Sequence, residues 1–228
     1  MTFSLAQSVP KDLLLIRHGE TAWNRERRLQ SHLDIPLSAS GEEQVRWAGK
    51  WIARAMRLST SAALWTSPIV RARQSAALLR ESLADEGWPQ LEVQVHAGLR
   101  EIDAGAFTGR TLPSLAQELR WQDYLIRPYD TRFPDGESVR EVQERAHGAL
   151  LEILDVGPAT VIAVTHGGII RALIAALLGL PESVYHAVRI GNASVTHLRC
   201  AQAGVRVLSL NGAENVGALL ADAALPPR

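Results

Sequence analysis

The chain has 228 residues, 46% of them hydrophobic and 21% charged, and its 24 lysine and arginine residues balance its 24 aspartate and glutamate residues. This length and apolar content suffice for the core of one α/β domain or, at most, of two small ones. Because the charges balance, no global field attracts nucleic acid or an anionic membrane surface, and we expect neither as a partner.

The cysteine content and the N-terminal stretch indicate the compartment. The single cysteine, Cys200, excludes an internal disulfide bond and a zinc site built from cysteines. A chain without disulfides fits a reducing compartment, and we expect a cytoplasmic protein. Residues 1–10 are expected to be a loose lead-in without a signal peptide, because the apolar run from Leu13 to Ile16 is far shorter than the ~7–15 residues of a signal-peptide core.

In the first half of the chain, short apolar runs alternate with amphipathic segments. Ser40 has the spacing of a capping box, and Ser67 followed by Pro68 has the pattern of an N-cap before the first helical residue. These patterns predict, in order, a strand over 12–17, a helix over 40–57, a strand over 62–66, a helix over 67–86 and a strand over 91–95.

The segment 99–136 breaks this pattern, because it mixes glycine, proline, aromatic and charged residues around one helical patch near 112–125. We predict that it is an insertion or lid over the strand ends. No element is predicted for the tail from Gly212. Between the two, the sequence predicts a helix over 138–154, a strand over 160–165, a helix over 168–178, and strands over 194–199 and 204–210 that form a hairpin at the sheet edge.

Strands that alternate with helices predict an α/β fold, here a three-layer sandwich with a mostly parallel central sheet and helices on both faces. No repeat and no linker demands two domains, so we expect residues 1–228 to form a single domain with its core over about 12–210. The run 162–180 is long enough to span a membrane, but His166 and Arg171 interrupt it, which favours a strand, a turn and a buried helix.

Polar residues follow three of the predicted strands, at the point where each strand ends. Ligands of such sheets bind beyond the carboxyl ends of the strands. We therefore expect these ends to converge on one site. The three stretches are Arg17-His18-Gly19, Thr66-Ser67-Pro68 and Thr165-His166-Gly167-Gly168.

The residues expected to converge suit a compact, multiply charged oxyanion such as phosphate, because they supply guanidinium groups, imidazoles and helix N-termini. Arg17 and Arg71 are the guanidinium donors, and Gly167 lets the phosphate-binding backbone turn tightly after His166. Taken singly, Arg71 is better explained as an exposed helix residue, and Arg17 with His18 is equally well explained as a strand end. The joint pattern at three strand ends favours the phosphate site.

A histidine at the centre of such a pocket indicates more than binding. The neutral imidazole of His18 can attack phosphorus if one ring nitrogen is free and the other donates to a backbone carbonyl, an approach that Gly19 permits. His166 and the arginines would stabilise the phosphoryl oxygens, so the chemistry needs no metal and no other cofactor. The leaving group needs a proton donor. Glu101 is the candidate and Asp103 its competitor, since repulsion from a phosphate favours a protonated carboxyl group.

Five stretches of the chain resemble, in order and spacing, the motifs of the histidine phosphatase superfamily, whose fold is phosphoglycerate mutase-like. They are LIRHGETAWN, SPIVRARQSA, LREIDAGAFTG, FPDGESV and VTHGG, within residues 12–200. The resemblance implies that His18 is the phosphorylated nucleophile and that Glu101 is the proton donor. It also implies a phosphate pocket completed by Arg17, Arg71 and His166, with Asn24 touching the phosphate or the substrate.

Three functions are compatible with this resemblance: a phosphomonoesterase acting on a small phosphorylated metabolite, a 2,3-bisphosphoglycerate-dependent phosphoglycerate mutase, and a non-catalytic phosphate-binding or regulatory protein. Mutases of this kind carry a longer insert with paired arginines and a lysine. Here only 35 residues separate Glu101 from Glu137, with no Arg-Arg pair and no lysine. This favours the phosphatase, and the third function is disfavoured because no catalytic position is substituted.

Other features leave alternatives open. Ser31 stands where phosphatases of this family have a glycine, and Phe107 and Thr108 stand where they have tryptophan and glutamate. These departures concern the identity of the substrate. His32 either rims the pocket or lies on the surface. The edge strand near 194–210 could pair across a homodimer or be covered by the tail.

Overall fold

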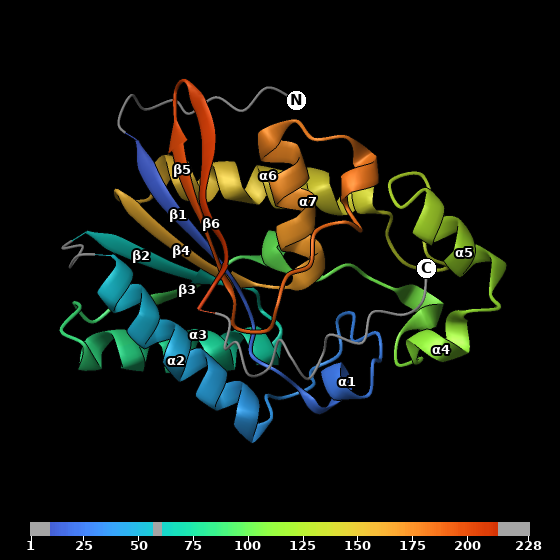
Figure 1. Cartoon of the computed structure of the whole chain (residues 1–228), viewed down its shortest axis with the longest axis horizontal. Coiled ribbons are helices and arrows are strands. Elements are labelled where there is room, and N and C mark those ends of the chain that lie inside the picture. The colour runs from blue at the N-terminus through green and yellow to red at the C-terminus, as the bar shows by residue number, and fades with distance from the viewer. Residues whose placement is uncertain (1–9, 57–60, 214–228) are drawn as a thin grey trace.

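A computed structural model describes residues 10–56 and 61–213, and this part of the chain contains one six-stranded sheet in the order β3-β2-β4-β1-β5-β6 (Figure 1). Strands β1 to β4 run parallel, and β5 and β6 form an antiparallel hairpin at one edge. The predicted, mostly parallel sheet with an edge hairpin is therefore confirmed. The strands are β1 (Lys11–Arg17), β2 (Ala62–Thr66), β3 (Val93–Val95), β4 (Thr160–Thr165), β5 (Val195–Ala201) and β6 (Gly204–Gly212).

Helices cover both faces of the sheet, with α2 and α3 on one side and α6 and α7 on the other (Figure 1). Successive residues of β1 point to opposite faces. Leu13 and Leu15 pack in the core beneath α6 and α7, whereas Leu14 and Ile16 pack in the core beneath α2 and α3. The three-layer sandwich is thus confirmed. The helices are α1 (Ala22–Arg25), α2 (Ala39–Ala55), α3 (Val70–Asp85), α4 (Leu112–Leu115), α5 (Leu119–Ile126), α6 (Val139–Val156) and α7 (Gly167–Leu178).

The starts of two helices differ from the prediction. Helix α2 begins after Ser38, whose hydroxyl accepts a hydrogen bond from the Gly41 amide at 3.1 Å, so Ser40 is not the cap. Helix α3 begins at Val70 without a side-chain cap, and Ser67 and Pro68 precede it. Ser67 does not cap this helix because its hydroxyl lies 2.8 Å from the ring of a histidine on another strand end.

Helix α6 begins as predicted. Ser138 is its N-cap and forms a capping box with Glu141: the Ser138 hydroxyl accepts from the Glu141 amide, and the Glu141 carboxylate accepts from the Ser138 amide. Such a reciprocal pair satisfies two backbone donors that a helix start otherwise leaves open.

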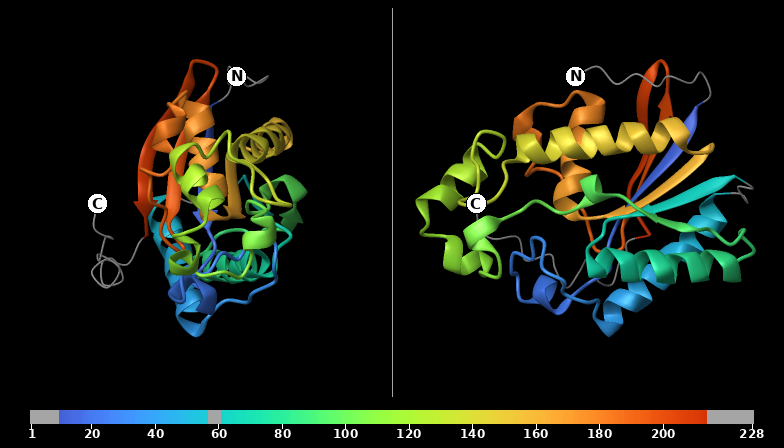
Figure 2. Two further views of the ribbon diagram at one scale, coloured as in Figure 1. Left: turned by 90° about the vertical axis from the view of Figure 1, so that its right-hand side faces the viewer. Right: turned by 180° about the vertical axis from the view of Figure 1, so that it is seen from behind.

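The predicted insert, 99–136, contains the two short helices α4 and α5 in place of one helical patch. Seen from behind, these helices project beyond the end of the sheet (Figure 2). The insert is tied to the loop after α1, because the Leu29 amide donates to the Arg110 carbonyl at 3.0 Å and the Gly109 amide donates to the Leu29 carbonyl at 2.8 Å. The insert and this loop together form one wall beside the carboxyl ends of the strands.

The ends of the chain fall outside the described residues. The predicted lead-in at 1–10, apart from its last residue, and the tail beyond residue 213 are not described. Among the residues that are described, no helix is both long and apolar enough to cross a membrane. The run 162–180 forms β4, a turn and α7, as its interruptions predict.

Candidate active site

The three polar strand ends converge, because β2, β4 and β1 are neighbours in the sheet and run parallel. The rings of His18 and His166 lie with their centroids 5.2 Å apart. Arg71, from the first turn of α3, places its Nε 3.2 Å from Nε2 of His18. The prediction that these strand ends converge at one edge of the sheet is therefore confirmed.

His18 is buried and held in one orientation. Its Nδ1 donates to the carbonyl of Gly19 at 2.7 Å, and its Nε2 accepts from Arg71, which has only donors to offer. These partners assign a neutral imidazole with its proton on Nδ1 and a lone pair on Nε2. Burial, reinforced by the positive charges of Arg71 and Arg17, holds the pKa of His18 well below its usual value.

A glycine is needed immediately after His18. A Cβ on Gly19 would lie 2.3 Å from the carbonyl oxygen of Gly41 at the start of α2. No side chain fits at that distance, so any other residue would push the loop away from the helix. The Gly19 amide also donates to the Ser75 hydroxyl on α3 at 3.1 Å. The loop that positions His18 is thus fixed by both helices of this face.

Backbone carbonyls fix the two arginines. Arg71 is 1% exposed, and its guanidinium donates to the carbonyls of Ser31 at 2.8 Å and Leu33 at 2.9 Å. Arg17 donates to the carbonyl of Ile190 at 2.6 Å. Burial lowers the pKa of Arg71 to about 10, so the group stays charged at neutral pH. Two fixed cations beside His18 form an electrostatic site prepared for an anion.

His166 is fully buried, and its hydrogen bond with Ser67 distinguishes its two ring nitrogens. Its Nε2 lies 2.8 Å from the Ser67 hydroxyl, which also accepts from the Ile69 amide. Its Nδ1 is buried and makes no hydrogen bond within the described part of the chain. Burial, with smaller effects of Arg71 and His18, holds the pKa of His166 well below its usual value. A proton donated by Ser67 to Nε2 leaves Nδ1–H as the donor for a ligand.

Glu101 reaches the cavity from the start of the insert. One carboxylate oxygen accepts from the Ile102 amide at 3.0 Å, and the other lies 3.3 Å from the Gly168 amide at the start of α7. A Cβ on Gly168 would lie 2.4 Å from the Glu101 carboxylate, so any other residue here would displace this carboxylate from its present position. Glu101 therefore sits between the insert and the helix that follows His166.

Asp103, the alternative candidate for the proton donor, forms its hydrogen bonds away from the cavity. Its carboxylate accepts from the Ser31 hydroxyl at 3.1 Å and from the Gly105 amide at 2.9 Å. It does not line the cavity, whereas Glu101 does. His32 donates from Nε2 to the backbone carbonyl of Glu101 at 2.8 Å, so its role is to hold the segment that carries this side chain.

Asn24 and Gly167 lie at the predicted site, but they make contacts there that the sequence does not predict. Asn24 lines the cavity, but its side-chain oxygen accepts from the Thr21 amide in the capping box of α1 and from Asn192. Asn192 also donates to the carbonyl of His18 at 3.2 Å. A Cβ on Gly167 would lie 3.4 Å from Nε of Arg17, which places this glycine beside that guanidinium.

Sequence reasoning missed three residues of the site: Ser67 as the partner of His166, Asn192, and Arg171. Arg171 carried a signal, since it is the only charged residue in the apolar helix α7. Asn192 carried none, because it stands in an irregular loop before β5. The position of Ser67 before a predicted helix indicated a helix cap, which is not the role that the structure gives it.

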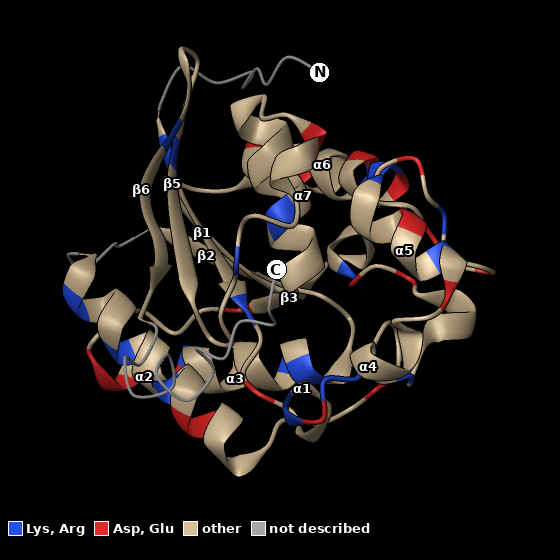
Figure 3. Cartoon of the chain, turned by 45° about the vertical axis from the view of Figure 1, so that its right-hand side comes forward, with Lys and Arg blue, Asp and Glu red and all other residues tan. Residues whose placement is uncertain are grey.

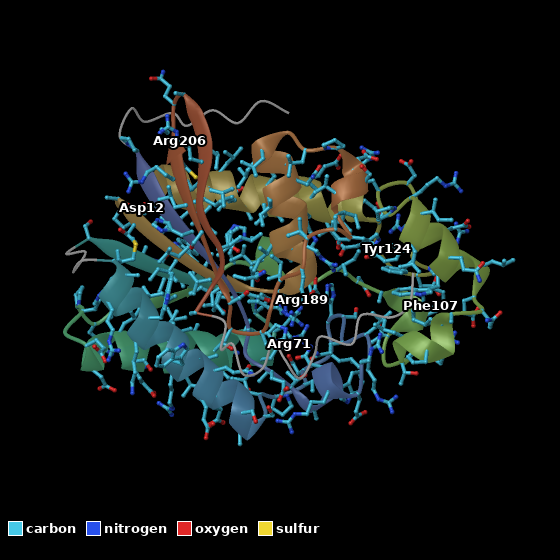
Figure 4. The ribbon with its side chains drawn as sticks, viewed as in Figure 1. Asp12, Arg71, Phe107, Tyr124, Arg189 and Arg206 are labelled. Atoms are coloured by element: carbon cyan, nitrogen blue, oxygen red, sulfur yellow. The ribbon has the colours of Figure 1, made fainter. Side chains whose placement is uncertain are left out.

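One cavity of about 470 Å³ is lined by His18, Arg17, Arg71, Glu101, Arg171 and Asn192, whereas His166 and Ser67 lie behind its lining residues. Its inner end holds His18, Arg17 and Arg71, and its outer part is lined by apolar and aromatic side chains of the insert. In Figure 3, basic segments of α1 and α7 are both visible next to the insert helices. In Figure 4, Arg71 lies near the centre of the molecule, and Tyr124 and Phe107 lie on the insert side. Within residues 10–56 and 61–213, no three histidine, cysteine, aspartate or glutamate side chains are grouped to hold a metal ion.

Comparisons with known proteins find relatives over most of the chain. The family model of the histidine phosphatase superfamily (branch 1) matches residues 13–213. A protein of Salmonella arizonae named probable phosphoglycerate mutase GpmB is 33% identical over 187 residues, or 81% of this chain and 82% of that protein. A solved phosphoserine phosphatase from Entamoeba histolytica is 25% identical with a TM-score of 0.76, covering 90% of this chain and 98% of that one. A mycobacterial glucosyl-3-phosphoglycerate phosphatase is 30% identical with a TM-score of 0.75, covering 88% and 98%.

Proposed function

The chain belongs to the histidine phosphatase superfamily, and on this premise we propose that it is a phosphomonoesterase that hydrolyses a small phosphorylated metabolite through a phosphohistidine at His18. One observation carries the proposal. The lone pair on Nε2 of His18 faces two fixed guanidinium groups in a cavity, while Nδ1 is held by the Gly19 carbonyl. A histidine that only bound phosphate would need a proton on the nitrogen that faces it.

In the first step, Nε2 of His18 attacks phosphorus while the bond from phosphorus to the leaving oxygen breaks. Arg17, Arg71 and Nδ1–H of His166 stabilise the charge on the three phosphoryl oxygens. Glu101 gives its proton to the leaving oxygen, so that an alcohol departs and a carboxylate remains. No metal ion is required for this step, because the cations are supplied by side chains.

In the second step, a water molecule attacks the phosphohistidine. The Glu101 carboxylate accepts a proton from this water as the bond from phosphorus to Nε2 breaks. The products are inorganic phosphate, neutral His18 and protonated Glu101, so the site is ready for another cycle. The same carboxyl group thus serves as acid and then as base.

The mutase remains a second candidate because a relative with 33% identity is named a probable phosphoglycerate mutase. A mutase must bind a second anionic group of its intermediate firmly enough to return the phosphoryl group to it. Three insert arginines are instead engaged in surface ion pairs: Arg110 with Glu118, Arg127 with Asp123, and Arg132 with Glu141. None of the insert arginines lines the cavity, which supports the phosphatase.

The deciding experiment follows a labelled phosphoryl group. Wild-type protein, quenched in alkali during turnover of a ³²P-labelled aryl phosphate, should carry the label on His18 and release inorganic phosphate with or without a chelator. The variant His18→Gln should lose both, with a fall in kcat of at least about 10³-fold. The control His197→Gln, in a part-buried pair with Asp12 on the neighbouring strand, should keep both.

Three results would contradict the proposal. Full turnover by His18→Gln would show that His18 is not the nucleophile. Conversion of 3-phosphoglycerate to 2-phosphoglycerate in the presence of 2,3-bisphosphoglycerate, faster than phosphate release, would identify a mutase. A protein that binds inorganic phosphate but hydrolyses no phosphomonoester would instead be the non-catalytic binding protein.

A further inference from the structure

The cavity is larger than a phosphate group requires. Its volume of about 470 Å³ falls in the range of sites that enclose a whole small molecule, ~300–1,000 Å³. The inner end accounts for the phosphoryl group, so the remaining space must receive the leaving group. The side chains that line the outer part of the cavity therefore determine which leaving group can bind.

One side of this outer part is an aromatic wall from the insert. Tyr124 stands against Phe133 with ring centroids 4.5 Å apart, and Trp121 stacks on Tyr124 at 5.3 Å. All three rings are at most 9% exposed, so the wall is held by packing and does not need a ligand to form. A wall of this kind favours an apolar, preferably ring-shaped, surface on the leaving group.

A cation, Arg171, comes from the second turn of α7. Its guanidinium lies over the ring of Tyr185, 4.6 Å from the centroid, and it lines the same cavity as His18. Its Nε is buried and has no hydrogen-bond acceptor among the described residues. A guanidinium stacked on an aromatic face keeps its edge free for a planar anion.

Arg171 acts at the outer part of the cavity and not on the nucleophile. Its charge affects Tyr124, Tyr185 and His186, whereas Arg71 and Arg17 are the cations that act on His18. Burial raises the pKa of both tyrosines above the usual value, so neither phenol is an anionic partner at neutral pH. The only acid that lines the cavity is Glu101, which is neutral when it serves as proton donor.

Two further cations, Arg27 and Arg28, line the cavity from the loop after α1; Arg27 is exposed, and Arg28 pairs with Glu26 at 2.5 Å. His186 also lines the cavity, and its pKa is lowered by burial and then by Arg171, so it adds no positive charge at pH 7. Its Nε2 already points to the Tyr124 carbonyl at 3.4 Å. Arg171 is the cation whose charge acts on Tyr124 of the aromatic wall, and a carboxylate matches both the single charge and the planar edge of its guanidinium.

From this arrangement we propose that the substrate is a phosphomonoester of a hydroxy acid with an apolar or aromatic skeleton, whose carboxylate is bound by Arg171 and whose skeleton lies against Trp121, Tyr124 and Phe133. The inference rests on the proposed phosphomonoesterase function, because that function places the phosphoryl group at the inner end. It adds a substrate class and a specificity-determining residue.

The test compares ligands that differ only in the carboxylate. Calorimetry measures the affinity of benzylphosphonate, its 3- and 4-carboxy derivatives and their methyl esters, none of which can be hydrolysed at the carbon–phosphorus bond. Wild type should bind at least one carboxylated isomer about tenfold or more tightly than its methyl ester and than benzylphosphonate. Arg171→Gln should reduce this ratio to within about twofold, and Arg171→Lys should give an intermediate ratio.

Arg206→Gln serves as the matched control, because Arg206 lies on the β5–β6 hairpin away from Arg71 (Figure 4); it should keep the wild-type ratio. A wild-type ratio near one for both isomers overturns the inference even if the Arg171 variants do not fold. Persistence of the ratio in a folded Arg171→Gln variant also overturns it.

Turnover of p-nitrophenyl phosphate is measured in parallel. Its absence, with the carboxylate preference intact, would count against the phosphomonoesterase and not against the subsite.

Discussion

His18 is prepared as a nucleophile by contacts that impose opposite roles on its two ring nitrogens. The Gly19 carbonyl can only accept, and the Arg71 guanidinium can only donate. The two contacts therefore fix both the tautomer and the ring orientation before a substrate arrives. Ser67 performs a comparable task for His166, where a hydroxyl at Nε2 leaves Nδ1 for the ligand. Each catalytic imidazole thus depends on a partner that takes no part in the chemistry.

The acid role of Glu101 predicts an effect that depends on the leaving group. In Glu101→Gln, kcat for an alkyl phosphate should fall about 10²–10⁴-fold, whereas kcat for p-nitrophenyl phosphate should fall about tenfold or less, because p-nitrophenolate departs without a proton. Steady-state kinetics with both substrates measure this difference. The matched control is Asp103→Asn, since Asp103 is tied to Ser31 and Gly105, and it should affect both substrates equally. Equal losses in Glu101→Gln would contradict the acid role.

Helix α6 is the element that holds the Glu101 segment in place. Arg145, on its buried side, donates to the carbonyls of Gly98, Arg100 and Glu101 at 2.8–2.9 Å and pairs with Glu137 at 2.8 Å. Although burial opposes it, hydrogen bonds from Arg145 and from the Asp103 amide lower the pKa of Glu137. One arginine therefore ties a helix to the loop that delivers the catalytic carboxyl group.

Removal of this arginine should affect both stability and catalysis. Arg145→Gln should lower the free energy of unfolding by about 2 kcal/mol, since it breaks charge-assisted hydrogen bonds that are mostly shielded from water. Urea unfolding measures this change, and kcat should fall because Glu101 is less well positioned. The control Arg46→Gln removes an exposed pair with Glu81 at 3.4 Å and should cost about 0.5 kcal/mol or less. A cost for Arg145→Gln as small as for Arg46→Gln would show that the segment is held by other contacts.

At the scale of the whole molecule, the sheet brings residues from distant parts of the chain to one edge and buries two histidines there. Both His18 and His166 have pKa values well below the usual value, first because they are buried. Below about pH 6.5 the unfolded chain protonates them while the folded chain does not. The site therefore makes the fold less stable as the pH falls from 6.5 towards the folded pKa values.

This linkage predicts a measurable pH dependence. In phosphate-free buffer, the free energy of unfolding should fall between pH 7 and pH 5.5, with each of the two histidines contributing up to about 1.4 kcal/mol per pH unit once the unfolded state is protonated. Urea unfolding at several pH values measures the slope. The double variant His18→Gln/His166→Gln should show a shallower slope than wild type. A stability that stays constant or rises on acidification, or an unchanged slope in the variant, would contradict the prediction.

Much of the fold and the principal site residues follow from the sequence, because they depend on local patterns. Four apolar residues from Leu13 to Ile16 define a buried strand, and Arg17 and His18 follow it at the edge where parallel strands end. The same reasoning places His166 after β4. Since all parallel strands end at one edge, the order of elements suffices to bring these residues together.

The tertiary structure alone decided how each side chain is used. It assigned Ser67 to His166 and not to a helix cap, turned Asp103 into the loop and Glu101 into the cavity, and directed Arg171 to the outer part of that cavity. Ser31 has a left-handed backbone with φ 47°, a conformation that favours glycine and that the sequence pattern alone does not show. These outcomes depend on contacts between segments far apart in the sequence, and no local pattern encodes which of two nearby polar groups a distant partner will meet.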